Sequence, residues 1–221
     1  MLQAHEGGNK VYLKIIDGKL RQEVDKETAG AVKREWKAPD GSEGTKWEMV
    51  YDTVSGTITN ISFRETDFGK FLNLEFDGTE VVAFHTDHRY FSDVVKKLAS
   101  CDITKPMSIR PYDFTDKDEK RITGVSVTQE GHGWKDNKAP DFFYDFEKKT
   151  YKHDFPKAGH TKDKPYDKDD WKAYFIGVKK FLVAYVTLSI IPLVEKHAQD
   201  ETEEVMVAPE GEDIKLSDIP F

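Results

Sequence analysis

Hydrophobic and polar positions alternate most regularly in the middle of the chain. Over residues 70–76, Leu72, Leu74 and Phe76 fall on one face of an extended segment, and Phe71, Asn73 and Glu75 fall on the other. This period of two predicts a β-strand with one face in the core. Asp77-Gly78 then predicts a hairpin turn that leads into a second strand over Thr79–His85.

The segments around this hairpin predict the rest of a small barrel. They are a long strand over Trp47–Thr66 bent at Gly56, a helix over His88–Ser100 capped by Thr86-Asp87, and strands over Met107–Phe114 and Lys120–Gln129. Three strands, a helix and two strands follow the order of an OB-fold barrel. Phe63, Phe76 and Phe84 are expected in its core. Another small barrel or an α+β sheet would also satisfy the pattern.

The N-terminal part adds a hairpin to this barrel. Val11–Ile16 and Lys19–Val24 predict two strands around the turn Asp17-Gly18, and the charged residues 25–46 predict a loop or a mobile arm with a turn at Pro39-Asp40-Gly41. The expected fold is therefore mainly β: a five-stranded OB-fold barrel with an N-terminal hairpin extension, spanning residues 1–133.

Residues 134–198 predict a second region that packs on the barrel. Eight aromatic residues fall within 134–170, whereas a disordered linker is normally poor in aromatics. Asp167–Asp170 predicts the cap of a long helix over Trp171–Lys196, which we expect to be buried against the body or a second subunit because it is apolar nearly all round beyond Phe181. Residues 199–221 lack periodicity and predict a disordered tail.

Charge is distributed unevenly along the 221 residues. The chain carries 33 basic and 41 acidic residues, a net charge of −8, which argues against nucleic-acid binding when it is taken as an average. Residues 199–221 hold eight of the acids and only one base, a net charge of −7 that leaves −1 for the first 198 residues. The pattern is a nearly neutral body with an acidic tail.

Several classes of protein are excluded by composition. The single cysteine, Cys101, rules out an internal disulfide and fits a reducing compartment, and the N-terminus has no signal-peptide pattern. The longest apolar run, Phe181–Val194, is shorter than the roughly 20 residues of a membrane span. We therefore expect no membrane partner and a cytoplasmic protein, either of a bacterium or of a phage-infected host cell.

Candidate catalytic chemistry is weak. The pair His85 and His88 spans a strand end and a helix start, and the remaining histidines lack companion cysteines, so no zinc site is expected. Acid groups at 116–119 and 167–170 are interleaved with lysines at turn or cap positions, and no phosphate-binding glycine loop is present. We expect no enzyme, no catalytic residue, no cofactor and no metal.

Candidate residues for single-stranded DNA combine aromatic rings, on which bases stack, with cations for the phosphates. They flank the expected binding loops and strands of the barrel, and Arg110 and Tyr112 qualify if Ile109 points inward. The full set is Lys33, Arg34, Trp36, Lys37, Arg64, Phe68, Lys70, Phe71, Arg110, Tyr112, Arg121, Trp134 and Lys135. For each ring, packing in the core or on the surface is the alternative.

The last four residues are the most specific motif. Asp218-Ile219-Pro220-Phe221, behind an acidic segment, resembles the tail tip of bacterial and phage single-stranded DNA-binding proteins, although Lys215-Leu216-Ser217 stands where the family usually has more aspartates. The terminal Phe side chain can fill an apolar pocket while the carboxylates pair with Arg or Lys around it. The resemblance implies that this tip docks on replication, recombination or repair proteins.

Together these features predict a single-stranded DNA-binding protein, of a divergent phage or mobile-element type, that binds without strong sequence preference and recruits partner enzymes through its tip. A homo-oligomer is compatible with the apolar helix. The alternative is an OB-like protein-interaction adaptor that does not bind DNA directly.

Overall fold

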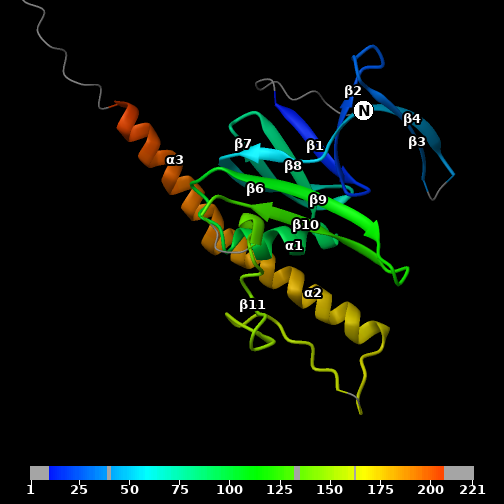
Figure 1. The fold of residues 1–221 in the computed structure, drawn as a ribbon, viewed down its shortest axis with the longest axis vertical. Coiled ribbons are helices and arrows are strands. Elements are labelled where there is room, and N and C mark those ends of the chain that lie inside the picture. The colour runs from blue at the N-terminus through cyan, green and yellow to red at the C-terminus, as the bar shows by residue number, and fades with distance from the viewer. Residues whose placement is uncertain (1–9, 39–40, 132–134, 162, 207–221) are drawn as a thin grey trace, which may run out of the picture.

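A seven-stranded mixed sheet forms the largest part of the structure, a computed structural model that describes residues 10–38, 41–131, 135–161 and 163–206 (Figure 1). The strand order is β3-β4-β2-β1-β8-β7-β6. Neighbouring strands are antiparallel except β1 and β8, which are parallel. The strands are β1 (Val11–Ile16), β2 (Lys19–Val24), β3 (Val32–Lys37), β4 (Glu43–Tyr51), β6 (Ile58–Thr66), β7 (Gly69–Phe76) and β8 (Glu80–His85).

A smaller sheet in the order β10-β9-β5 contains β5 (Val54–Gly56), β9 (Met107–Thr115) and β10 (Arg121–Thr128). The chain passes from β5 directly into β6, and so from one sheet to the other. Gly56 makes this bend at a φ of +152°, and a Cβ there would collide with the Asp77 carboxylate. The bend predicted at Gly56 is confirmed.

Two predictions for the segment before this bend are wrong. The strand expected over Trp47–Thr66 is divided among β4, β5 and β6, and residues 25–46 are not a loop, because β3 and the start of β4 pair as a hairpin. Charged and polar side chains occupy both faces of β3, so no hydrophobic alternation marks it as a strand. Two residues of the turn predicted at Pro39-Asp40-Gly41 lie outside the described residues.

Helix α1 (Arg89–Leu98) follows β8 and buries Phe91, Val94, Val95 and Leu98, as the spacing predicts. The predicted cap at Thr86-Asp87 is wrong: His88 is the N-cap, and its imidazole accepts the Tyr90 N–H at 3.4 Å. His88 has the extended backbone of a cap residue, with a φ of −94° and a ψ of 147°.

Helix α1 and the β1–β2 hairpin occupy the opening between the two sheets. In the described residues β8 pairs with β7 and β1, and β10 pairs with β9, so the strands do not close into a hydrogen-bonded barrel. On α1, Asp93 accepts the N–H of Val125 in β10 at 2.5 Å, and Lys97 donates to the carbonyl of the same residue. The tip of the hairpin donates its Gly18 N–H to the Tyr90 hydroxyl at 3.0 Å.

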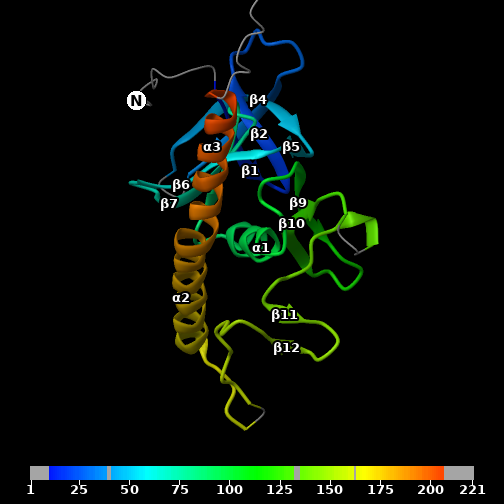
Figure 2. The same ribbon diagram turned by 90° about the vertical axis from the view of Figure 1, so that its left-hand side faces the viewer.

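One long helix runs beside β6 of the larger sheet and the end of α1 (Figure 2). It comprises α2 (Lys168–Tyr185), a π-helical turn labelled η2 (Val186–Ile190) and α3 (Ile191–Met206). Asp167 and Asp170 form a reciprocal capping box at its start, which confirms the predicted cap. The helix also covers residues 199–206, so the prediction of disorder there is wrong, while residues 207–221 lie outside the described residues.

This helix is buried on one side only. Every fourth residue from Val178 to Val194 is buried, whereas Phe175 and Leu188 are 60% and 76% exposed. The body covers one side of the helix, as expected, and burial of the other side against a second subunit stays a prediction. By length and composition alone, the helix Lys168–Asp200 could cross a membrane. The sequence had predicted no membrane span, because the apolar run Phe181–Val194 is too short for one. Core helices of soluble proteins share this length and composition, and 22% of an apolar 18-residue stretch of this helix is buried.

The aromatic segment before the helix packs against it. Phe143 and Phe155 are buried, and the Phe143 ring centroid lies 5.4 Å from Phe181 and 5.0 Å from Tyr185. Short elements organise the segment: η1 (Lys135–Asn137), β11 (Tyr144–Asp145) and β12 (Thr150–Tyr151). The core cluster of the sheets therefore continues into this segment and the long helix.

Candidate nucleic-acid interface

The outward side chains of β1, β6, β7 and β8 form a surface that we call the open face. On these strands Leu13, Leu72, Leu74 and Phe84 point into the core, so alternate residues point away from it. Strand pairing aligns the outward residues in three rows: Arg64, Phe71 and His85; Ser62, Asn73, Ala83 and Lys14; and Asn60, Glu75, Val81 and Tyr12.

The first row combines aromatic rings with a cation. The ring of Phe71 meets the ring of His85 edge to face, with centroids 4.8 Å apart. The Nδ1 atom of His85 accepts the Asp87 N–H, which assigns its proton to Nε2, and Nε2 donates to the Phe68 carbonyl at 2.8 Å. This bond holds the β6–β7 turn, where the Phe68 side chain is 85% exposed. Arg64 is exposed and has no ion-pair partner among the described residues.

Lys70 lies on the other side of the sheet from Phe71. Its ammonium is 4.9 Å from the centroid of the Phe63 ring and 3.6 Å from a carboxylate oxygen of Glu65. Adjacent residues of a strand point in opposite directions, so these two predicted DNA-binding residues cannot belong to one face of the sheet.

Strand β9 presents a separate aromatic and basic surface. Arg110 and Tyr112 were expected to point outward if Ile109 points inward, and Ile109 is buried. Both side chains therefore lie on the outward face of β9, together with Phe114. The rings of Tyr112 and Phe114 lie 5.9 Å apart. Phe114 is 52% exposed. It is not in the predicted DNA-binding set, although alternation from Ile109 indicates that it points outward. Within the described residues, no ring contact or ion pair connects this surface with the first row.

Arg121 is bound by a carboxylate. Its Nε and Nη2 atoms donate to the two oxygens of Asp113 at 2.9 and 2.6 Å, and this pairing holds the pKa of Asp113 below its usual value. The residue points to the opposite side of the β9–β10 hairpin from Tyr112. Its charge is therefore less available to a phosphate than that of Arg64.

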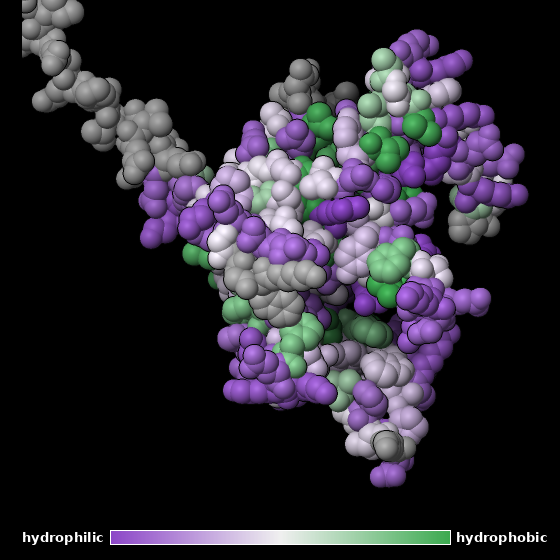
Figure 3. Space-filling view, viewed as in Figure 1, coloured by the Kyte–Doolittle hydropathy of each residue, from purple (hydrophilic) through white to green (hydrophobic). Residues whose placement is uncertain are grey.

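The predicted basic arm is the β3–β4 hairpin, and two of its three predicted cations, Lys33 and Arg34, are paired with acids. Arg34 donates two hydrogen bonds to Glu48 at 2.8 and 2.6 Å, and Lys33 bonds Glu35 at 2.8 Å. Trp36 shares the Arg34 face and rests against Gly44, where a Cβ would lie 2.9 Å from the indole ring. Lys37 shares the Lys33 face. In the space-filling view, hydrophilic side chains dominate this hairpin (Figure 3).

The remaining predicted residues are not placed. Trp134 and the tail tip Asp218-Ile219-Pro220-Phe221 lie outside the described residues, and of Lys135 only the backbone is described. Several residues of the open face are absent from the predicted DNA-binding set, among them Tyr12 and Lys14 on β1. Their positions on either side of buried Leu13 are the signal that marks them as outward.

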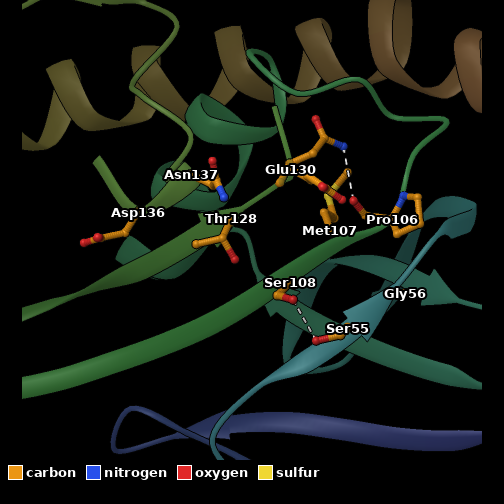
Figure 4. Close-up of a pocket in the computed structure, with 10 residues that line it drawn as sticks. Ser55, Gly56, Pro106, Met107, Ser108, Thr128, Glu130, Asp136 and Asn137 are labelled. Carbon is orange, nitrogen blue, oxygen red and sulfur yellow. Dashed lines mark hydrogen bonds between the residues drawn. The ribbon is translucent and has the colours of Figure 1, made fainter. Parts of the chain in front are cut away.

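A hollow lies apart from the open face, where β5, β9 and the end of β10 meet (Figure 4). Its floor is held by a hydrogen bond between the hydroxyls of Ser55 and Ser108. Glu130 and Asp136 contribute acidic groups, and neither an aromatic ring nor a basic side chain lines it among the described residues. This chemistry disfavours phosphate, so the open face is the better candidate for a nucleic acid.

Comparison of the chain with protein-family models, with curated proteins and with solved structures gives no match.

Proposed function

We propose that this protein binds single-stranded DNA without strong sequence preference and that the open face is its main contact. The observation that carries the proposal is the row of Arg64, Phe71 and His85 beside the exposed ring of Phe68. A single strand needs aromatic faces for its bases and cations for its phosphates, and this row offers both within three adjacent strands.

The proposed architecture behind this site is an OB barrel opened on one side. Strands β6, β7 and β8, helix α1, and strands β9 and β10 follow the OB order, and the pairing of β5 with β9 connects the two sheets. In that order β7 and β8 are the second and third strands, whose outer face binds oligonucleotides in OB folds. The β1–β2 hairpin and α1 take the place of the pairing that would close the barrel.

Charge on the open face is compatible with a phosphate backbone. Glu75, the one acidic residue in its three rows, is paired with Lys10 at 2.7 Å. Lys14 and Arg64 are exposed without an ion-pair partner in the described residues. With few unpaired cations, we expect a moderate rather than a steep salt dependence of binding.

The proposal extends to partners through the tail. Its tip, Asp218-Ile219-Pro220-Phe221, would recruit replication, recombination or repair proteins in the cytoplasm of a bacterium or an infected host cell. The resemblance of these four residues to the family's tail tip supports this part of the proposal.

The test is fluorescence anisotropy of labelled dT20 and of a duplex of equal length. We expect dT20 to bind more tightly than duplex, and Arg64→Ala to weaken dT20 binding. Lys172→Ala is the matched control, because Lys172 is an exposed cation of the long helix without an ion pair in the described residues. Absence of dT20 binding would contradict the proposal and favour the adaptor alternative.

A further inference from the structure

A hollow on the open face is lined from four strands. Tyr12 and the preceding Lys10 lie at one side, Val81 and the pair Asn73 and Glu75 lie in the middle, and Asn60 and Ser62 complete the other side. Val81 is buried and forms the floor. The hollow depends on β1, because this added strand pairs with the edge of β8 and places Tyr12 directly beside Val81.

The wall of this hollow offers an aromatic face. The side chain of Tyr12 is 50% exposed, and within the described residues it makes neither a ring contact nor a hydrogen bond. A half-exposed ring without an aromatic neighbour is suited to stacking against another flat ring. Base–aromatic stacking is one such use.

The hollow also offers hydrogen bonds in a small space. The side chains of Asn60, Ser62 and Asn73 have no hydrogen-bond partner among the described residues. Each amide presents both donors and an acceptor, which matches the edge of any nucleobase. The carboxylate of Glu75 is held by Lys10, so it places no unpaired negative charge against an incoming nucleotide.

We propose that this hollow receives one unstacked nucleobase of the bound strand, stacked on Tyr12 with its edge toward Asn60 and Asn73. The inference rests on the proposed function and adds a subsite to it. Lys14 lies one row away, exposed and without an ion pair in the described residues, where it can meet an adjoining phosphate. The added N-terminal strand is thereby part of the binding surface and not only a cover for the sheet edge.

The test compares Tyr12→Ala and Tyr12→Phe in the full chain by anisotropy with dT20. Loss of a stacked base predicts about tenfold weaker binding for the alanine variant, whereas the phenylalanine variant keeps its ring and its affinity. Tyr51→Ala is the matched control, because Tyr51 is an exposed tyrosine of the same sheet outside the open face. Asn73→Ala is expected to weaken binding severalfold.

The outcomes separate the two proposals. Wild-type affinity in Tyr12→Ala, with binding still weakened by Arg64→Ala, would overturn the nucleobase hollow and leave the proposed function in place. The second measurement is calorimetric titration of the protein with free dTMP. Binding of dTMP that Tyr12→Ala abolishes, in a protein that does not bind dT20, would support a nucleobase hollow and overturn the proposed function. Binding of neither probe would overturn both.

Discussion

At the residue scale, Glu48 on β4 is the one buried charged residue among those described. It is 3% exposed and lies between two guanidinium groups, with Arg34 on β3 at 2.6 Å and Arg21 on β2 at 3.1 Å. The hydrogen bond from Arg34 holds the pKa of Glu48 below its usual value against the opposing effect of burial. This cluster ties the β3–β4 hairpin to the rest of the sheet.

We predict that Glu48→Gln destabilises the protein by about 3 kcal/mol, because it leaves two partly buried cations without their anion. A lowered pKa in the folded state means that the contribution is complete above the unfolded value of about 4.3 and is lost as pH falls through the folded value. Urea unfolding at neutral and acidic pH measures both effects.

The control for this variant is Glu35→Gln, which removes an exposed partner of Lys33 on the same hairpin. Surface pairs contribute little to stability, so this variant should unfold like the wild type. Equal unfolding midpoints for the two variants would contradict the role given to Glu48.

At the scale of elements, helix α1 acts as a cover for a sheet edge. Strand β10 is the last strand of the smaller sheet, and its outer edge presents backbone groups without a neighbouring strand. Asp93 and Lys97 satisfy both backbone groups of Val125, and they also pair with each other at 2.9 Å. One turn of the helix thus replaces the strand that would close a barrel.

Removal of this contact should destabilise the junction. We expect Asp93→Ala to cost about 1–3 kcal/mol, because the Val125 N–H loses its acceptor in a partly buried position. Hydrogen exchange of the Val125 amide should accelerate at the same time. Ser92→Ala, one residue earlier on the helix, is the control, and equal exchange rates in the two variants would refute the edge-covering role.

The elements that the sequence predicted correctly have local signals. Asp17-Gly18 forms a two-residue turn with φ values of +49° and +71°, the left-handed geometry that Asp-Gly favours. The apolar face of α1 and the capping box at Asp167 are likewise read from spacing of three or four residues. The β3–β4 hairpin lacked such a signal, since ion pairs rather than an apolar face hold it.

The candidate site was also predictable only in part, because local patterns do not indicate which strands become neighbours. Alternation around Leu13, Leu72 and Ile109 indicates which side chains point outward, and so identifies Phe71 and Tyr112. Which outward residues become neighbours depends on pairing between strands distant in the chain. The parallel pairing of β1 with β8 places Tyr12 beside Val81, and no local pattern indicates it.

At the scale of the whole molecule, the proposed DNA binding must be compatible with a net charge of −8. Most of that charge belongs to residues 199–221, and the nearly neutral remainder pairs many of its cations with acids, as at Arg34 and Arg121. On the open face, Lys14 and Arg64 are exposed near aromatic side chains and make no ion pair within the described residues. Affinity should therefore depend on stacking as well as charge.

Photo-crosslinking tests this claim most directly. The wild-type protein is bound to an oligonucleotide of twenty residues in which 5-iododeoxyuridine replaces thymidine, irradiated, and mapped by mass spectrometry. Adducts at Phe68, Phe71, His85 or Tyr12 would place the strand on the open face, as we predict. Adducts confined to Tyr112 and Phe114, or a bound strand that gives none at Phe68, Phe71, His85 or Tyr12, would contradict the account.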